Sequence, residues 1–195
     1  MRLSRKDIIN RLEYYPFRVL TALLRLLPIS CSRAFILFLF HFVGYYIGIR
    51  KKVARIQLSK VYPNWSKDKI NRTLKGLYRQ MALNIVEEYL MDDETLSNKS
   101  SILGREHLDE AMALNRGTIL ATAHFGNWEA ARILPLKGIP LSVITKKQRN
   151  TLFDAHTNRI RERSGLHVID MRKGLRDIIS DLKENRVVAI LADQN

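Results

Sequence analysis

Four short apolar runs, separated by helix-like stretches, constrain the fold of this chain more than any other feature. The runs cover residues 118–123, 141–145, 166–170 and 187–192. The helix-like stretches between them are 127–137, 150–164 and 172–184. This alternation favours parallel βαβ units, and near-continuous apolar strands indicate a sheet covered on both faces. We therefore predict an α/β fold with a mainly parallel sheet flanked by helices.

The sequence closes directly after the last apolar run, on Asp193, Gln194 and Asn195. A domain rarely ends directly after one of its central strands. We therefore expect residues 61–195 to form an incomplete α/β domain in a chain that is truncated at its C-terminus.

Residues 1–60 have a different character. Their apolar stretches, 17–29 and 34–49, are each shorter than the roughly 20 residues that a spanning helix needs. Arg25 and Arg33 would be costly in the middle of a longer span. Both flanks are basic, so the positive-inside rule selects no orientation. We expect an N-terminal membrane-associated segment of two short helices that dip into one leaflet. A buried helical hairpin of a soluble protein is the alternative.

The charge predicts an anionic partner, because 33 Lys and Arg against 19 Asp and Glu give a net +14. Nucleic-acid binders tend to interleave basic residues with exposed aromatic ones. Here the aromatic residues gather between 35 and 46, inside an apolar stretch. This arrangement favours an anionic membrane over nucleic acid. The single cysteine, Cys31, excludes an internal disulfide.

Residues 66–91 are predicted to form an amphipathic helix with Ser66 as its N-cap. The expected apolar face consists of Ile70, Leu74, Leu77, Met81, Ile85 and Tyr89. The opposite face is basic, which suits either anionic headgroups or ordinary solvation.

The strongest candidate for chemistry follows the first apolar run, in His124-Phe125-Gly126-Asn127-Trp128-Glu129. Sites in parallel sheets form at the carboxyl ends of strands, where His124 is expected. Asn127 is a suitable N-cap for the next helix, which would place Glu129 in its first turn. Gly126 allows the chain to turn, so that Glu129 can reach back to orient His124 as a general base. On spacing alone the pattern is weak, and a structural histidine is the alternative.

The whole hexapeptide is more specific, because it resembles the His-x4-acidic motif of the lysophospholipid acyltransferase-like superfamily. More closely, it resembles the bacterial lipid A late acyltransferases. Further likenesses are Leu26-Leu27-Pro28, Tyr62-Pro63-Asn64-Trp65-Ser66, Glu87-Glu88-Tyr89, Asn115-Arg116-Gly117 and Ala192-Asp193-Gln194-Asn195. They extend over nearly the whole chain, but the last third of that family is missing.

The resemblance implies a glycerolipid acyltransferase-like fold and a membrane-bound enzyme on the cytoplasmic side of the bacterial inner membrane. Its donor would be an acyl thioester on acyl carrier protein or coenzyme A, and its acceptor a hydroxyl of a lipid A precursor. His124 would deprotonate that hydroxyl and Glu129 would orient His124. No cofactor is implied.

Asn127 and the basic residues near these strand ends are candidates for binding the substrate or the developing oxyanion. Arg159, Arg161 and Arg163 precede the third strand, and Arg163 is the first choice because it lies nearest to it. Lys146, Lys147 and Arg149 follow the second strand and are candidates for lipid phosphates or the acidic carrier protein. A solvated basic face is the alternative for both groups. Asp193, at the end of the fourth strand, would hold its loop or contact substrate.

Other classes of function have less support. No Gly-x-Ser-x-Gly elbow, P-loop or GxGxxG motif occurs. His107, His156 and His167 show no partner pattern, and no zinc site is suggested. Two alternatives stay open: an acyltransferase for another glycolipid or phospholipid, and a non-catalytic basic module that binds membrane surfaces.

Overall fold

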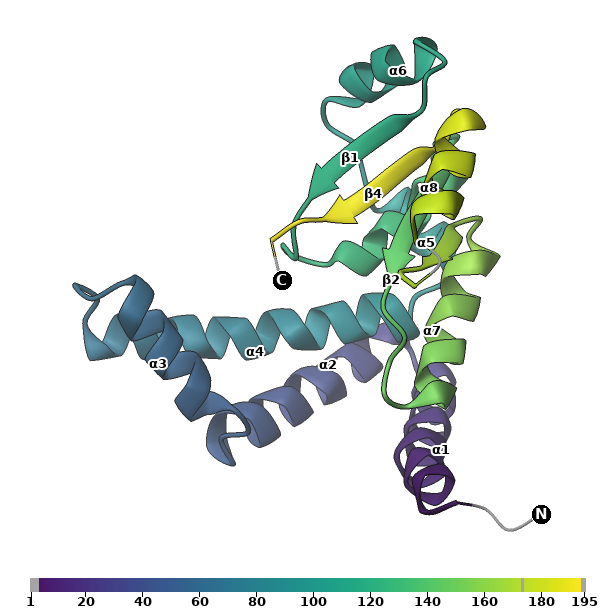
Figure 1. Cartoon of the computed structure of the whole chain (residues 1–195). Helices are drawn as coiled ribbons and strands as arrows, with labels where there is room; N and C mark the ends of the chain where they lie inside the picture. Colours follow the sequence, from purple (N-terminus) through teal and green to yellow (C-terminus); the bar gives the residue numbers. More distant parts are fainter. Residues whose placement is uncertain (1–3, 173, 194–195) are drawn as a thin grey trace. The chain divides into compact units, whose positions relative to one another are not determined.

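A computed structural model describes residues 4–172 and 174–193, which form two compact units (Figure 1). The sheet unit combines the chain up to Val19 with the chain from Asp92 onward, and the helical unit is Leu20–Met91. The compact units do not divide between residues 60 and 61. The predicted boundary between residues 60 and 61 follows a change in composition, and it stays a prediction.

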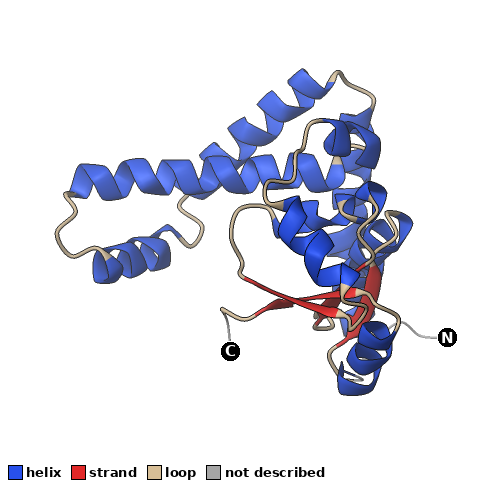
Figure 2. Ribbon diagram, turned by 90° about the horizontal axis from the view of Figure 1, so that it is seen from above, coloured by secondary structure: helices blue, strands red, loops and turns tan. Residues whose placement is uncertain are grey.

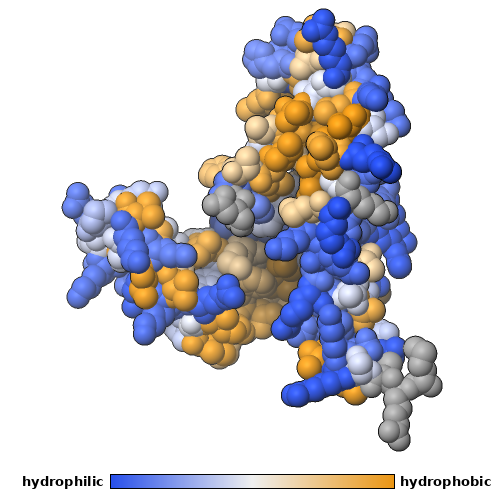
Figure 3. Space-filling view, viewed as in Figure 1, coloured by the Kyte–Doolittle hydropathy of each residue, from blue (hydrophilic) through white to orange (hydrophobic). Residues whose placement is uncertain are grey.

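The sheet unit contains four strands in the order β1-β4-β2-β3, and every neighbouring pair is parallel. They are β1 (Thr118–Thr122), β2 (Leu141–Thr145), β3 (His167–Asp170) and β4 (Val187–Leu191). Figure 2 shows them as one red layer. The predicted α/β class and parallel sheet are therefore confirmed. Apolar surface gathers over β1 and β4 in Figure 3. Ile119 of β1 is 59% exposed.

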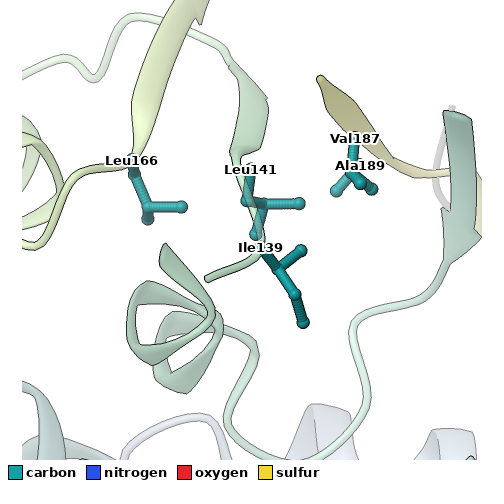
Figure 4. Packing of buried hydrophobic residues seen from close by; sticks show 5 residues of the cluster. All are labelled: Ile139, Leu141, Leu166, Val187 and Ala189. Atoms are coloured by element: carbon teal, nitrogen blue, oxygen red, sulfur yellow. The ribbon is translucent and has the colours of Figure 1, made fainter. Parts of the chain in front are cut away.

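The core of the sheet unit lies against one face of this sheet (Figure 4). Its buried residues are Ile139, Leu141, Leu166, Val187 and Ala189. Leu108 and Met112 of α6 (Arg105–Ala113) cover them. Val188 points to the opposite face because side chains alternate along a strand, and it is fully buried. The helices α7 (Thr151–Arg163) and α8 (Gly174–Lys183) follow the predicted ranges closely, and α8 packs on β3 and β4.

The segment after His124 differs from the α-helix predicted over 127–137. It forms two short 3₁₀ turns, η2 (Trp128–Ile133) and η3 (Pro135–Lys137). Pro135 has no N–H to donate, so an α-helical ladder cannot continue through it. The Asn127 side chain makes no capping hydrogen bond, and the backbone carbonyl of Asn127 accepts one from the Ala130 N–H at 3.1 Å. Asn127 therefore occupies the predicted N-cap position of η2, without the expected side-chain capping bond.

The first part of α1 (Arg5–Arg25) belongs to the sheet unit, where it packs on α7. Tyr14 and Phe17 contact Phe153 with ring centroids 5.3 and 5.0 Å away. The Asn150 side chain donates to the Asn10 carbonyl at 3.1 Å and to Glu13 at 2.9 Å. The beginning of the predicted membrane segment is thus part of the sheet unit in this structure.

The helical unit contains the end of α1, then α2 (Ile29–Phe40), the π-helical η1 (His41–Tyr46), α3 (Lys51–Val61) and α4 (Lys67–Tyr89). Ser32 donates to the Leu24 carbonyl at 2.6 Å and joins α2 to α1. Arg25 donates to the Tyr89 carbonyl at 2.9 Å.

One stretch among the described residues, Ile29–Tyr46, is long and apolar enough to cross a membrane by length and composition alone. It lies near the N-terminus, and 17% of it is buried. Core helices and signal sequences pass the same test.

The helix α4 confirms the N-cap, since Ser66 accepts a bond from the Lys69 N–H at 3.2 Å. Its buried face differs from the predicted one. The buried residues are Ile70, Leu74, Tyr78, Ala82 and Val86, a strict i, i+4 stripe. Leu77 and Met81 lie beside that stripe and are 42% and 45% exposed.

Candidate active site

A cavity of about 280 Å³ lies in the sheet unit where the strands end. Its polar lining includes His124 after β1, Glu129 on η2, Lys146 after β2 and Arg161 on α7. The rest of the lining is mostly apolar, with contributions from Phe125, Trp128, Leu134, Val143 and Leu191. Four of the predicted site residues therefore share one cavity at the carboxyl edge of the sheet.

His124 is held by Asp193 through the register of two neighbouring strands. Thr122 pairs with Leu191 across β1 and β4, so the residues two positions further along lie side by side. His124 Nδ1 and Asp193 Oδ1 are 2.9 Å apart. An ionised carboxylate only accepts hydrogen bonds, so Nδ1 carries the proton and Nε2 is left as the acceptor.

The hydrogen bond from the His124 side chain is the main reason that the pKa of Asp193 lies below its usual value of 3.8. A lowered carboxyl pKa means that the pair is present above the ordinary value and is lost only as the pH falls through the lowered one. At neutral pH, Asp193 is therefore ionised and keeps the imidazole in one tautomer.

The turn after His124 exposes the motif. Gly126 has φ 63°, in the left-handed region that glycine adopts most easily. Phe125 is 90% exposed, and the Trp128 ring lies edge-on to the imidazole at a centroid distance of 4.9 Å. The imidazole thus has an aromatic wall on one side.

Glu129 is bound by Arg161 in a bidentate pair. Arg161 Nε donates to Glu129 Oε2 at 2.9 Å, and Arg161 Nη2 donates to Oε1. Both side chains are largely buried, at 13% and 14% exposed. Such a fork places the carboxylate firmly in the cavity wall. The orienting role predicted for Glu129 stays a prediction, because the hydrogen bonds described for His124 and for Glu129 go to other partners.

Helical geometry places the three arginines of α7 on different sides of the helix. Residues two positions apart on an α-helix point in nearly opposite directions, since each position turns by about 100°. Arg161 faces the cavity, whereas Arg159 and Arg163 are exposed and do not line it. The structure thus places Arg161 and not Arg163 at the cavity, because the side of the helix decides this more than nearness in sequence to β3, and the role of Arg163 stays a prediction.

The basic residues after β2 also separate. Lys146 lines the cavity, as expected, and Lys147 does not. Arg149 is 81% exposed in its side chain and binds Glu13 of α1 at 3.0 Å. The structure thus places only Lys146 of this group at the cavity that holds His124.

Behind the cavity lies a buried ion pair that sequence reasoning missed. Arg132 on η2 has a side chain only 2% exposed and donates through Nε to Asp93 at 2.6 Å. Asp93, on α5 (Asp93–Asn98), also accepts from Ser164 at 2.6 Å. This cluster ties η2, α5 and the end of α7 together and so positions the segment that carries Glu129.

Two histidines without a predicted partner have one in the structure. His167 Nδ1 lies 2.7 Å from the buried Asp181 of α8, and His156 contacts Arg18 of α1 at 3.1 Å. These contacts join elements within the sheet unit, away from the cavity. Within residues 4–172 and 174–193, no three His, Cys, Asp or Glu side chains are grouped to hold a metal ion.

Comparison with known proteins identifies the family of this chain. The family of bacterial lipid A biosynthesis acyltransferases matches residues 10–195. The chain belongs to this family. The resemblance seen in the sequence is therefore confirmed over nearly the whole chain.

Curated relatives carry related names. A lipid A biosynthesis acyltransferase of Haemophilus influenzae is 23% identical over 161 residues, which cover 78% of this chain and 51% of the relative. A phosphatidylinositol mannoside acyltransferase of Mycobacterium tuberculosis is 31% identical over 98 residues, 47% of this chain and 31% of the relative. The chain thus spans about half the length of the first relative and about a third of the length of the second.

Proposed function

We propose that the protein containing this chain transfers a fatty acyl group from a thioester to a hydroxyl of a lipid A precursor, with His124 as general base. The observation that carries the proposal is the His124–Asp193 hydrogen bond at the edge of the cavity. It leaves Nε2 as a proton acceptor, which is what deprotonation of a hydroxyl requires.

The reaction balances without a covalent enzyme intermediate. Nε2 of His124 takes the proton of the acceptor hydroxyl, whose oxygen attacks the thioester carbonyl. The C–O bond forms, the C–S bond breaks, and the proton passes from His124 to the departing thiolate. The donor thiol is that of acyl carrier protein or coenzyme A, and both fit the proposal.

The neighbouring charges have separate roles in this scheme. Arg161 holds the Glu129 carboxylate in the wall of the cavity that contains His124, where its charge stabilises the imidazolium that forms. Lys146 supplies a positive charge for a phosphate of the acceptor. This step assigns no role to the other predicted site residues, which are Asn127, Arg159, Arg163, Lys147 and Arg149.

The reaction is proposed to take place at the cytoplasmic face of the inner membrane. Both substrates carry acyl chains, the apolar stretch Ile29–Tyr46 is little buried, and the chain has a net charge of +14. These features support binding to an anionic membrane.

A second acceptor class has a specific observation in its favour. The mycobacterial relative is named for a phosphatidylinositol mannoside, which is a glycolipid with an anionic phosphate and sugar hydroxyls. His124 and Lys146 suit such an acceptor equally well on chemical grounds.

Mass spectrometry of total lipids tests the proposal. Cells that lack the gene should lose one acyl chain from lipid A, and the intact gene should restore it, whereas a His124→Ala gene should not. Loss of an acyl chain from another glycolipid would select the second acceptor. An unchanged lipid profile in the deletion strain would refute acyl transfer in both forms.

A further inference from the structure

The helical unit contains a second cavity, of about 500 Å³, that has no part in the proposed chemistry. Its walls come from α2 with η1, from α3 and from α4, all within Leu20–Met91. The apolar lining includes Leu39, Val43, Val53, Ala54, Leu77 and Met81. We call this cavity the helical groove. Its volume is in the range typical of small-molecule and cofactor sites.

The floor of the groove is built by a close fit between Tyr78 and Gly44. A Cβ atom at Gly44 would lie 2.2 Å from the Tyr78 ring, so η1 can approach α4 only with glycine at this position. The Tyr78 hydroxyl donates to the Ile49 carbonyl at 2.7 Å. The polar end of Tyr78 is therefore satisfied, and its ring presents an apolar surface to the groove.

Two residues explain why the groove is open to an apolar occupant. Leu77 and Met81 lie beside the buried stripe of α4, and both line the groove while 42% and 45% exposed. Apolar side chains lining an open hollow gain stability when another apolar group covers them. The occupant is therefore an apolar chain or surface.

The charge around the groove selects the kind of occupant. The helical unit has twelve Lys and Arg against three Asp and Glu, a net +9 of the chain's +14. Arg50, at the start of α3, is the charged residue among those lining the groove. Lys51 beside it is bound to the Tyr45 carbonyl at 2.8 Å and lies over the Tyr45 ring. Arg50 is thus placed to meet an anion at the entrance.

We infer that the helical groove holds one acyl chain of an anionic phospholipid of the bilayer, while Arg50 contacts the headgroup phosphate. This deepens the membrane-binding part of the proposed function and does not depend on acyl transfer. Apolar lining, a cation at the entrance and a strongly basic unit together match a lipid. A protein partner of mixed charge would gain little from the net +9.

Photo-crosslinking in a His124→Ala background tests the inference without any catalysis. The full chain is bound to vesicles of phosphatidylglycerol and phosphatidylcholine, with a photoreactive group on the phosphatidylglycerol acyl chain. Peptide mapping should find crosslinks on α3 and α4 at the groove residues. Crosslinks confined to α2, or equal labelling by photoreactive phosphatidylcholine, would overturn the inference.

Two variants with matched controls sharpen the test. Ala54→Phe fills the groove from α3 and should reduce groove crosslinks about fivefold or more, whereas Ser59→Phe on the same helix, outside the lining, should not. Arg50→Gln should weaken vesicle binding about fivefold and Lys60→Gln less, with circular dichroism confirming that each variant is folded. Undiminished crosslinking in folded Ala54→Phe would refute occupancy of the groove.

Discussion

The two cavities differ in nearly every physical respect. The cavity of the sheet unit collects titratable side chains, and these are fixed by hydrogen bonds such as His124 to Asp193 and Arg161 to Glu129. The helical groove is lined mostly by apolar side chains, and it also includes Tyr78, whose hydroxyl donates to a backbone carbonyl, and the charged Arg50. A fixed array of charged side chains suits a reaction in which charge develops on the substrate. An apolar cavity suits a bound molecule that does not react.

This difference assigns the proposed chemistry and the proposed membrane attachment to separate parts of the chain. The proposed general base lies in the sheet unit, and nine of the fourteen net positive charges lie in the helical unit. A change in one unit should therefore leave the function of the other intact. Each prediction below tests that separation.

The largest effect is expected from His124→Ala. Transfer should fall by roughly 10²–10⁴-fold, the usual contribution of a positioned general base. Binding to anionic vesicles should be unchanged. Thin-layer chromatography of acylated product and vesicle flotation measure the two properties. Near-normal transfer would remove His124 from the mechanism, and lost flotation would mean that the two functions are not separate.

Asp93→Ala should destabilise the sheet unit by about 3 kcal/mol, because it leaves the buried Arg132 cation without this carboxylate. Urea unfolding, followed by circular dichroism, measures the change. Asp109→Ala is the control, since Asp109 pairs with Arg105 on an exposed face and should cost under about 1 kcal/mol. Equal loss in both variants would show that the Arg132–Asp93 pair has no special weight.

Asp193→Asn and Glu129→Gln should separate two kinds of carboxylate. Each should slow transfer about 10- to 100-fold, since a hydrogen bond to a charged group contributes roughly 1.5–3 kcal/mol. Only Glu129→Gln should also lower the melting temperature clearly, because its partner Arg161 is largely buried. In a His124→Ala background, Asp193→Asn should cost no further activity. A further loss there would mean that Asp193 acts on something other than His124.

The smallest effect is expected from Lys146→Gln, which should raise KM for the anionic acceptor about fivefold with kcat nearly unchanged. Arg149→Gln is the matched control, since Arg149 binds Glu13 outside the cavity. Equal changes in both variants would indicate a general effect of charge and not a contact in the cavity.

Local patterns in the sequence predicted the strands, α7, α8 and the Ser66 cap, because propensity and period act over a few residues. They did not predict the 3₁₀ turns after His124, where Pro135 interrupts the ladder. They placed Leu77 and Met81 on the apolar face of α4 together with the buried Ile70 and Leu74, since the sequence does not reveal which of two adjacent apolar stripes is covered.

The candidate site could be predicted only in part, because local patterns do not reveal which elements become neighbours. His124, Lys146 and Asp193 follow from the rule that sites form at strand ends. The contact between His124 and Asp193 depends on β1 and β4 being neighbours, and strand order is a property of the whole sheet. The choice of Arg161 over Arg163 depends on which side of α7 faces the sheet, and the buried Arg132–Asp93 pair joins residues 39 positions apart.

The placement of β4 has a consequence for how the protein emerges from the ribosome. Within the described sheet, β4 bonds to both β1 and β2, although it is synthesised after them. The strands β1 and β2 therefore lack their shared neighbour until β4 has been synthesised and has inserted between them. Contacts of such long sequence separation form slowly. The same step brings Asp193 to His124, so the proposed general base is not oriented before β4 has joined the sheet.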